Sequence, residues 1–86
     1  MTVVELRLPD LGLGEVPIVL TVWHVRRGQA VTLGDRLVEV VAGSVAVDLP
    51  APASGVMRDL LVAEDEPLAV GQVLATLIPE RDPQDD

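Results

Sequence analysis

Short apolar segments separated by turn residues run the length of this chain. Residues 4–8 alternate apolar and charged side chains, the period-2 pattern of a half-buried strand. Further strands are expected where an apolar run is closed by glycine, proline or charged residues, at 16–25, 31–33, 37–41, 45–49, 56–62, 68–70 and 73–78. No window carries a sustained apolar stripe at helical spacing. Short strands with turn signals about every 8 to 12 residues predict an all-β sandwich or barrel.

An internal repeat supports this organisation. WHVRRGQAVTLGDRLVEV (23–40) aligns with LLVAEDEPLAVGQVLATL (60–77) at an offset of 37 residues, so that Gly34 falls on Gly71. The apolar positions match, but the turn charges do not, because Arg26 and Arg27 lie over Ala63 and Glu64. Neither half can bury its apolar face alone. The repeat therefore predicts two strand-turn-strand units packed face to face about a pseudo-two-fold axis.

Composition narrows the classes of function. A chain of 86 residues forms one domain, predicted to span 1–78 and to be followed by an acidic, proline-containing tail, 79–86, that is expected to fray. The net charge of -8 argues against nucleic acid and anionic membrane surfaces as partners. The absence of cysteine excludes disulfides and thiolate sites. Without a signal peptide or a bilayer-spanning run, the expected location is cytoplasmic.

Three segments together resemble the lipoyl/biotinyl carrier-domain family, and most closely the lipoyl domains of 2-oxo acid dehydrogenase acyltransferases. They are LRLPDLGLGE (6–15), similar to LPDLGEG; VWHVRRGQAVTLGDRLVEV (22–40), similar to WxVxxGDxVxxGDxLxEV; and DLPAPASGVMRDLLVAEDEPLAVGQVLATL (48–77). The resemblance covers residues 4–78 without gaps. It implies a flattened β-barrel of two four-stranded sheets with quasi-two-fold symmetry, in agreement with the strand pattern and the repeat.

The resemblance also locates a missing residue. In the family, a hairpin between the fourth and fifth strands carries Asp-Lys, and the lysine amine bears lipoate or biotin as a swinging arm. Alignment of residues 38–40 and 50–52 places Ser44 at the lysine position, in a Gly43-Ser44 turn typical of type II′. A serine hydroxyl cannot form the amide that the ligases make, and the chain contains no lysine at all. Neither lipoate nor biotin is therefore expected as a cofactor.

Other chemistry receives little support from the residues. Ser44 lacks the helix-borne Asp-Ser-Leu context of phosphopantetheine attachment, so a plain turn residue is the leading interpretation, with modification as the alternative. His24 is the only histidine, and the sequence shows no nucleophile or orienting partner beside it. The acids at 64–66 lack the spacing of a calcium loop. No catalytic residue and no metal site are expected, which argues against an enzyme.

Five apolar residues are candidates for a partner surface. Trp23 matches a family tryptophan and is expected to pack within the domain, with an anchoring role at an interface as the alternative. The other four belong to the loop that lies beside the lysine hairpin in lipoyl domains and to the strand that follows it. Burial within the domain is the favoured interpretation. If exposed, they would form an apolar patch at one end of the domain that could bind a partner. They are Leu11, Leu13, Val16 and Ile18.

The sequence thus predicts a lipoyl-like domain that acts as a non-catalytic binding or assembly module, docking to an acyltransferase-type complex or pairing with itself. The alternative is an acyl-carrying lipoyl domain of a 2-oxo acid dehydrogenase complex whose lysine was removed by engineering. The family's Thr-Asp-Lys is replaced throughout, by Ala42, Gly43 and Ser44. A single engineered change would have left the threonine and aspartate in place, so natural divergence is favoured.

Overall fold

The computed structural model describes residues 2–80, which form eight strands. They are β1 (Val4–Arg7), β2 (Ile18–Trp23), β3 (Ala30–Val31), β4 (Arg36–Ala42), β5 (Val45–Pro50), β6 (Gly55–Leu60), β7 (Pro67–Leu68) and β8 (Val73–Pro79). The last strand thus runs one residue past the predicted domain end, and the predicted tail lies outside the described residues from 81 onward. Within residues 2–80, no helix is long and apolar enough to cross a membrane.

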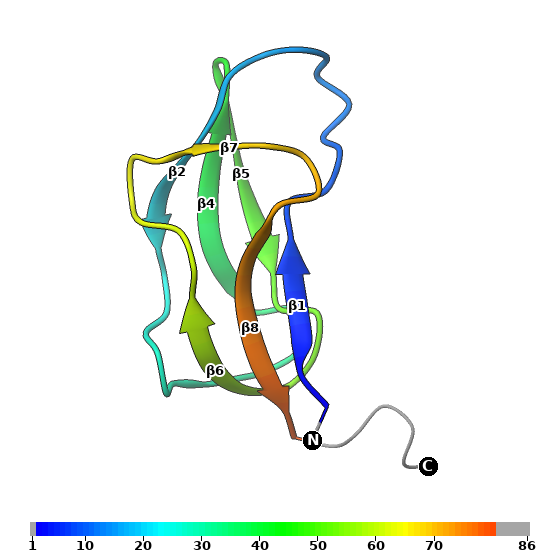
Figure 1. Cartoon of the computed structure of the whole chain (residues 1–86), viewed down its shortest axis with the longest axis vertical. Helices are drawn as coiled ribbons and strands as arrows, with labels where there is room; N and C mark the ends of the chain where they lie inside the picture. The colour runs from blue at the N-terminus through cyan, green and yellow to red at the C-terminus, as the bar shows by residue number, and fades with distance from the viewer. Residues whose placement is uncertain (1, 81–86) are drawn as a thin grey trace.

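The strands form two antiparallel four-stranded sheets, as predicted. Their orders are β1-β8-β6-β3 and β5-β4-β2-β7, and Figure 1 shows them wrapped around a single elongated core. Leu20, Leu37, Val38, Val40 and Leu74 are completely buried there, and no charged or polar side chain of the described residues is buried with them. The predicted all-β fold class is confirmed.

Several predicted strands are shorter than expected: 16–25 is reduced to β2 and 56–62 to β6, and the clearest cases are 31–33 and 68–70. Of residues 31–33, only Val31 belongs to a strand, the two-residue β3. The strand ends there because the next two backbone N–H groups donate to side chains. The N–H of Thr32 donates to Asp35 Oδ2 at 2.9 Å, and that of Leu33 donates to Ser54 Oγ at 2.8 Å. Local side-chain acceptors of this kind compete with strand pairing. At 68–70 the Ala69 N–H likewise donates to a side chain and β7 ends at Leu68.

The internal repeat is realised in the long-range hydrogen bonds. Met57 in β6 donates to the 28–29 turn at 2.9 Å and accepts from it at 2.7 Å. Leu20 in β2 makes the matching pair with the 65–66 turn, at 3.1 and 2.7 Å. Each turn thus lies against the central strand of the other half. Residues 28 and 29 precede residues 65 and 66 by 37 positions, and Leu20 precedes Met57 by the same number. The predicted pseudo-two-fold relation therefore holds in three dimensions.

The equivalence extends to backbone conformation. Gly28 has a φ of +86°, and Asp65, its counterpart, has a φ of +71°, the one positive value for a residue other than glycine in the described chain. Aspartate is among the few residues that visit this left-handed region with little cost. The second turn therefore keeps the shape of the first although its sequence carries the opposite charge.

Candidate functional site

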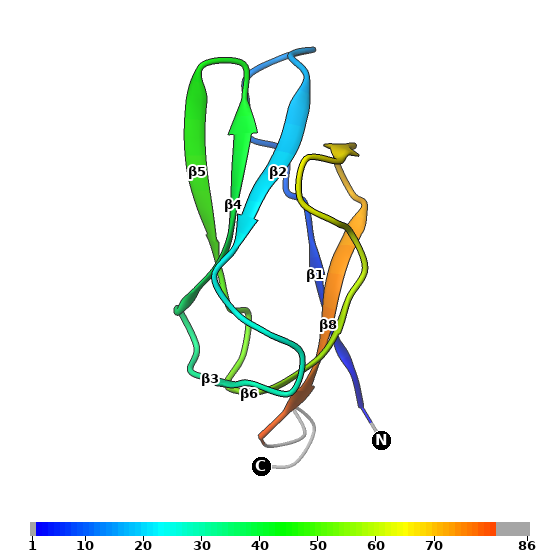
Figure 2. The same cartoon turned by 90° about the vertical axis from the view of Figure 1, so that its left-hand side faces the viewer.

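The β4–β5 hairpin forms one end of the molecule, seen uppermost in Figure 2. Ala42 pairs with Val45 across a two-residue turn made of Gly43 and Ser44. Gly43 has a φ of +61° while Ser44 keeps a negative φ, which are the signs of a type II′ turn. Both turn residues are exposed. Ser44 therefore presents its hydroxyl to solvent at the tip of the hairpin.

The C-terminal end of the 9–17 loop lies beside this hairpin, while the rest of the loop arches away from it (Figure 1). The Gly43 N–H donates to the carbonyl of Pro17 at 3.1 Å. A Cβ atom at position 43 would lie 3.7 Å from the Val16 side chain, which is ordinary van der Waals contact. At the far side of the loop, the Gly12 N–H donates to Asp10 Oδ1 at 2.8 Å. The loop is thus joined to the hairpin at its C-terminal end, by Val16 and Pro17.

The four candidate apolar residues of this region divide between core and surface. Ile18 is buried in β2, and Leu11 and Val16 are half-buried against the core. Leu13 is 39% exposed. The structure therefore does not bring all four together as an exposed patch, because three of them close the end of the barrel beneath the loop.

Val45 is a surface residue that the sequence interpretation missed. Val45, Val47 and Leu49 alternate along the strand and so share one face of β5, but Leu49 is buried while the Val45 side chain is 43% exposed. β5 is the edge strand of its sheet, so Val45 is exposed although its cross-strand partner Ala42 in β4 is buried. A hydrophobic residue directly beside the two-residue turn was the available signal. Val45 directly follows Ser44, and Leu13 is the exposed large apolar residue of the 9–17 loop.

His24 has a partner that the sequence did not show. Its Nε2 lies 3.0 Å from Asp48 Oδ1, and Arg36 Nη1 lies 3.5 Å from the other oxygen of the same carboxylate. The hydrogen bond from His24, helped by the positive charge of Arg36, lowers the pKa of Asp48 below its ordinary value of 3.8. No hydroxyl nucleophile joins this cluster in the described residues. It therefore links the edge strand β5 to β4 and to the segment that follows β2, without forming a catalytic arrangement.

This cluster predicts a pH-dependent contribution to stability. A lowered folded-state pKa means that ionised Asp48 stabilises the fold above the unfolded-state pKa and that this stabilisation disappears as the pH falls below it. We expect Asp48→Asn to have a lower urea midpoint than the parent at pH 5, and the difference to shrink as the pH is lowered from 4 to 2.5. Glu15→Gln, at an exposed loop carboxylate, is the control. A difference that stays constant down to pH 2.5 would contradict the assignment.

Trp23 joins the two halves of the repeat. Its indole Nε1–H donates to the Val62 carbonyl at 2.8 Å, and its backbone N–H donates to Glu64 Oε2 at 3.0 Å. The side chain is half-buried against the core. The packing role expected for Trp23 is therefore present, and part of the ring stays accessible on the surface.

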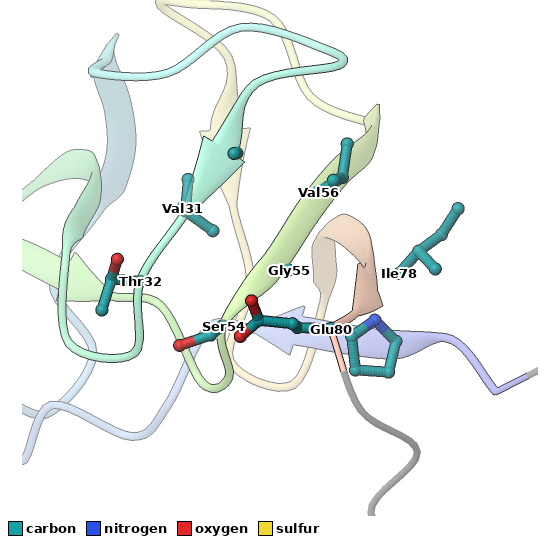
Figure 3. Close-up of a pocket in the computed structure, with 9 residues that line it drawn as sticks. Val31, Thr32, Ser54, Gly55, Val56, Ile78 and Glu80 are labelled. Carbon is teal, nitrogen blue, oxygen red and sulfur yellow. The ribbon is translucent and has the colours of Figure 1, made fainter.

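A hollow of about 410 Å³ lies at the opposite end of the molecule from the β4–β5 hairpin, between residues of β3, β6 and β8 (Figure 3). Val31, Val56 and Ile78 supply apolar walls, and Gly55 leaves the floor without a side chain. The Ser54 hydroxyl there already accepts the Leu33 N–H. Within residues 2–80, no cluster of three or more histidine, aspartate or glutamate side chains has the geometry to hold a metal ion.

Known proteins share this architecture. The biotin/lipoyl family model described as "Biotin-requiring enzyme" matches residues 4–77. The dihydrolipoyllysine-residue acetyltransferase components of the pyruvate dehydrogenase complex of Staphylococcus aureus and Staphylococcus epidermidis are 33% identical over 73 residues, covering 85% of this chain. This chain spans only 17% of the length of those relatives.

Solved structures agree on the fold. The lipoyl domain of the 2-oxoglutarate dehydrogenase complex from Azotobacter vinelandii superposes with a TM-score of 0.73 at 21% identity, covering 87% of this chain and 95% of that domain. A single-chain, multi-domain long-chain acyl-CoA carboxylase superposes with a TM-score of 0.75 at 17% identity, covering 94% of this chain and 7% of the carboxylase. With the two-sheet barrel, the projecting β4–β5 hairpin and the family match over residues 4–77, the chain belongs to the biotin/lipoyl domain family.

Proposed function

We propose that this chain is a lipoyl-like domain without a covalent carrier function, and that it acts as a protein-binding or assembly module. The observation that carries the proposal is the Gly43-Ser44 turn, at the position that the family resemblance assigns to the modified lysine. Ser44 has no amine, and the whole sequence contains no lysine that a shifted alignment would supply. The amide bond to lipoate or biotin therefore has no acceptor in this chain.

The intact hairpin favours a binding role over simple decay of the site. The turn keeps a glycine where a positive φ is required, and the adjoining loop remains hydrogen-bonded to it through Gly43. Leu13 and Val45 add exposed apolar surface at the same end of the domain. Retained shape with altered chemistry suits recognition by another protein, for which a swinging arm is not needed.

The relatives indicate the kind of assembly to consider. Those from Staphylococcus are components of the pyruvate dehydrogenase complex, in which they are named as acetyltransferases. We propose that this domain docks to an acyltransferase-type assembly or to a second copy of itself, in the cytoplasm, and that it performs no catalytic step. The only histidine is paired with a carboxylate, without a nucleophile in contact among the described residues.

The proposal predicts the outcome of a ligation assay. Incubated with a lipoate ligase, ATP and lipoate, the native chain is expected to gain no mass, because the ligase needs a lysine amine. The double variant Gly43→Asp/Ser44→Lys restores the family's Asp-Lys in the turn and is expected to gain the mass of one lipoyl group. Intact-mass spectrometry reads both results, and peptide mapping locates the added group.

The same measurement on protein isolated from its native host separates the alternatives. An unmodified mass supports the binding module, whereas a discrete added mass on Ser44 would restore a carrier with different chemistry. Ser44→Ala serves as the matched control, since it removes the hydroxyl but leaves the glycine of the turn in place. A native-host mass increment that survives in Ser44→Ala would have to be placed elsewhere in the chain.

A further inference from the structure

The two turns related by the internal repeat carry opposite charges. The basic turn, residues 26–29, reads Arg-Arg-Gly-Gln, and the acidic turn, residues 63–66, reads Ala-Glu-Asp-Glu. The charged side chains of both turns are exposed: Arg26, Arg27, Glu64, Asp65 and Glu66. The rest of the repeat keeps matching apolar positions, so the charges are where the two halves differ most.

Folding does not require this difference. In the basic turn, Gln29 Oε1 accepts the Arg26 N–H at 3.0 Å, and in the acidic turn Glu66 Oε1 accepts the Ala63 N–H at 3.2 Å. Each turn also has a backbone hydrogen bond from its fourth residue to its first. The Gln29 N–H donates to the Arg26 carbonyl at 3.0 Å, and the Glu66 N–H donates to the Ala63 carbonyl at 3.3 Å. Glu64 has one further role, because its Oε2 accepts the Trp23 N–H at 3.0 Å. The shared bonds use none of the other charged groups except the Glu66 carboxylate, whose counterpart is the neutral Gln29, so the two arginines of the basic turn need another explanation.

Arg26 and Arg27 also differ from the other arginines of residues 2–80 in forming no ion pair there. Every other arginine of residues 2–80 forms an ion pair, with Glu5, Asp48 or Asp59. No such pair is formed by Arg26 or Arg27 within the described residues, although the chain carries 14 acidic side chains. Two adjacent exposed cations are thus left for an acidic group from outside the domain.

The two turns lie on the same side of the molecule. Both are at the left-hand edge in Figure 1, the acidic turn in the upper half and the basic turn in the lower half, and both face the viewer in Figure 2. Trp23 lies between them, since it precedes the basic turn by three residues and donates its backbone N–H to Glu64 of the acidic turn. We call this side, which carries residues 26–29, residues 63–66 and Trp23, the turn face.

From this arrangement we infer that the turn face binds a second copy of the chain, with the two long axes antiparallel. A two-fold axis lying in the interface and perpendicular to the long axis brings the basic turn of each copy opposite the acidic turn of the other. Isologous interfaces of this kind repeat every contact twice. Arg26 and Arg27 then gain acidic partners, and the two Trp23 rings meet near the axis, where a tryptophan contributes most to an interface.

The dimensions of the face suit a weak dimer. The whole domain measures 40 × 22 × 18 Å along its principal axes, so the side that carries the turn face has an outline of at most about 700 Å². Standard interfaces bury roughly 800 Å² on each partner, so complete coverage would approach that size without exceeding it. The inference deepens the proposed function by naming the partner, and it rests on that function only in treating the domain as an assembly module.

Exchanging the turn sequences tests the inference directly. An all-acidic variant carries Ala-Glu-Asp-Glu at both turns, and an all-basic variant carries Arg-Arg-Gly-Gln at both. Each should dimerise at least about tenfold more weakly than the parent in sedimentation equilibrium, because like charges then meet at both contacts. Mixed one to one, the two variants should form heterodimers. Measurements at 0.15 M salt screen the general repulsion between acidic chains beyond about 8 Å.

The matched control exchanges the two turns with each other. This variant keeps the net charge of -8 and one turn of each kind, but it loses the Glu64 acceptor of the Trp23 N–H. Once circular dichroism shows that it is folded, it should dimerise like the parent. If a turn exchange prevents folding, Arg26→Gln/Arg27→Gln removes the two unpaired cations without touching a structural contact and should weaken dimerisation by a similar factor. Emission from the single tryptophan provides a second readout of association.

Defined results would overturn the inference. A parent chain that remains monomeric at 0.5 mM excludes it, as does an all-acidic variant that dimerises as tightly as the parent. Failure to form heterodimers from two folded variants also excludes it. None of these measurements depends on Ser44, so a modified serine would overturn the proposed function alone, and a monomeric chain would overturn the dimer alone.

Discussion

Gly55→Ala is expected to destabilise the domain by about 3 kcal/mol or more. A Cβ atom at position 55 would collide with the carbonyl oxygen of Ile78 and would lie 2.8 Å from the Cα of Pro79. Both are backbone atoms of β8, which pairs with β6 along its whole length and cannot move away as a flexible side chain would. Overpacking usually costs about 1–3 kcal/mol, and a backbone collision belongs at the upper end or beyond.

A loss of that size is a large part of the stability available. Small domains are stable by roughly 5 kcal/mol at the low end of the usual range, so Gly55→Ala should be largely unfolded near 40 °C. Urea unfolding followed by circular dichroism measures the effect. Gly43→Ala is the control, since a Cβ there meets Val16 at 3.7 Å and only the positive φ opposes it, at a cost of about 1 kcal/mol. Equal losses in the free energy of unfolding for Gly55→Ala and Gly43→Ala would show that the β8 backbone moves to make room for the added Cβ atom.

Leu37→Ala and Leu74→Ala should each cost about 2–5 kcal/mol. Both leucines are completely buried, one in β4 and the other at the equivalent position of β8. Truncation removes transfer free energy and leaves a cavity that two facing sheets cannot easily close. Because the two positions are related by the pseudo-two-fold, we expect their losses in the free energy of unfolding to agree within about 1 kcal/mol.

The control for this pair is Leu33→Ala. Leu33 is 64% exposed, and surface substitutions of this kind change stability by about 0.5 kcal/mol or less. Thermal unfolding of the three variants should give one transition each. Two transitions in either buried variant would mean that the halves of the repeat unfold separately, which would contradict a single shared core.

Much of the fold was accessible from the sequence because strand burial repeats with a period of two. The alternation in residues 4–8 and the apolar runs elsewhere placed all eight strands. The internal repeat predicted the pseudo-two-fold relation between the two halves, since Gly34 and Gly71 mark equivalent turns. Strand length was less accessible, because it depends on which acceptor captures each backbone N–H. At Thr32 and Leu33 side chains captured them, and β3 ended early.

The candidate site shows the same division. The identity of the turn residues and the absence of lysine are properties of the chain itself, so Gly43 and Ser44 were identified before any coordinates. Burial is a property of the packed domain. Leu13 and Ile18 are equally hydrophobic, yet the first is exposed and the second is in the core. Periodicity cannot separate them, because the loop between them has no regular repeat.

The sequence by itself determined which chemistry this protein lacks, since an amine or a thiol that is not encoded cannot be supplied by folding. It also determined the opposite charges of the two turns. Only the tertiary structure decided what those groups meet. Asp48 reaches His24 across 24 positions of sequence, and the 26–29 and 63–66 turns come to share one face because two antiparallel sheets close on a common core. Contacts between distant segments follow from chain packing, and local sequence carries no record of them.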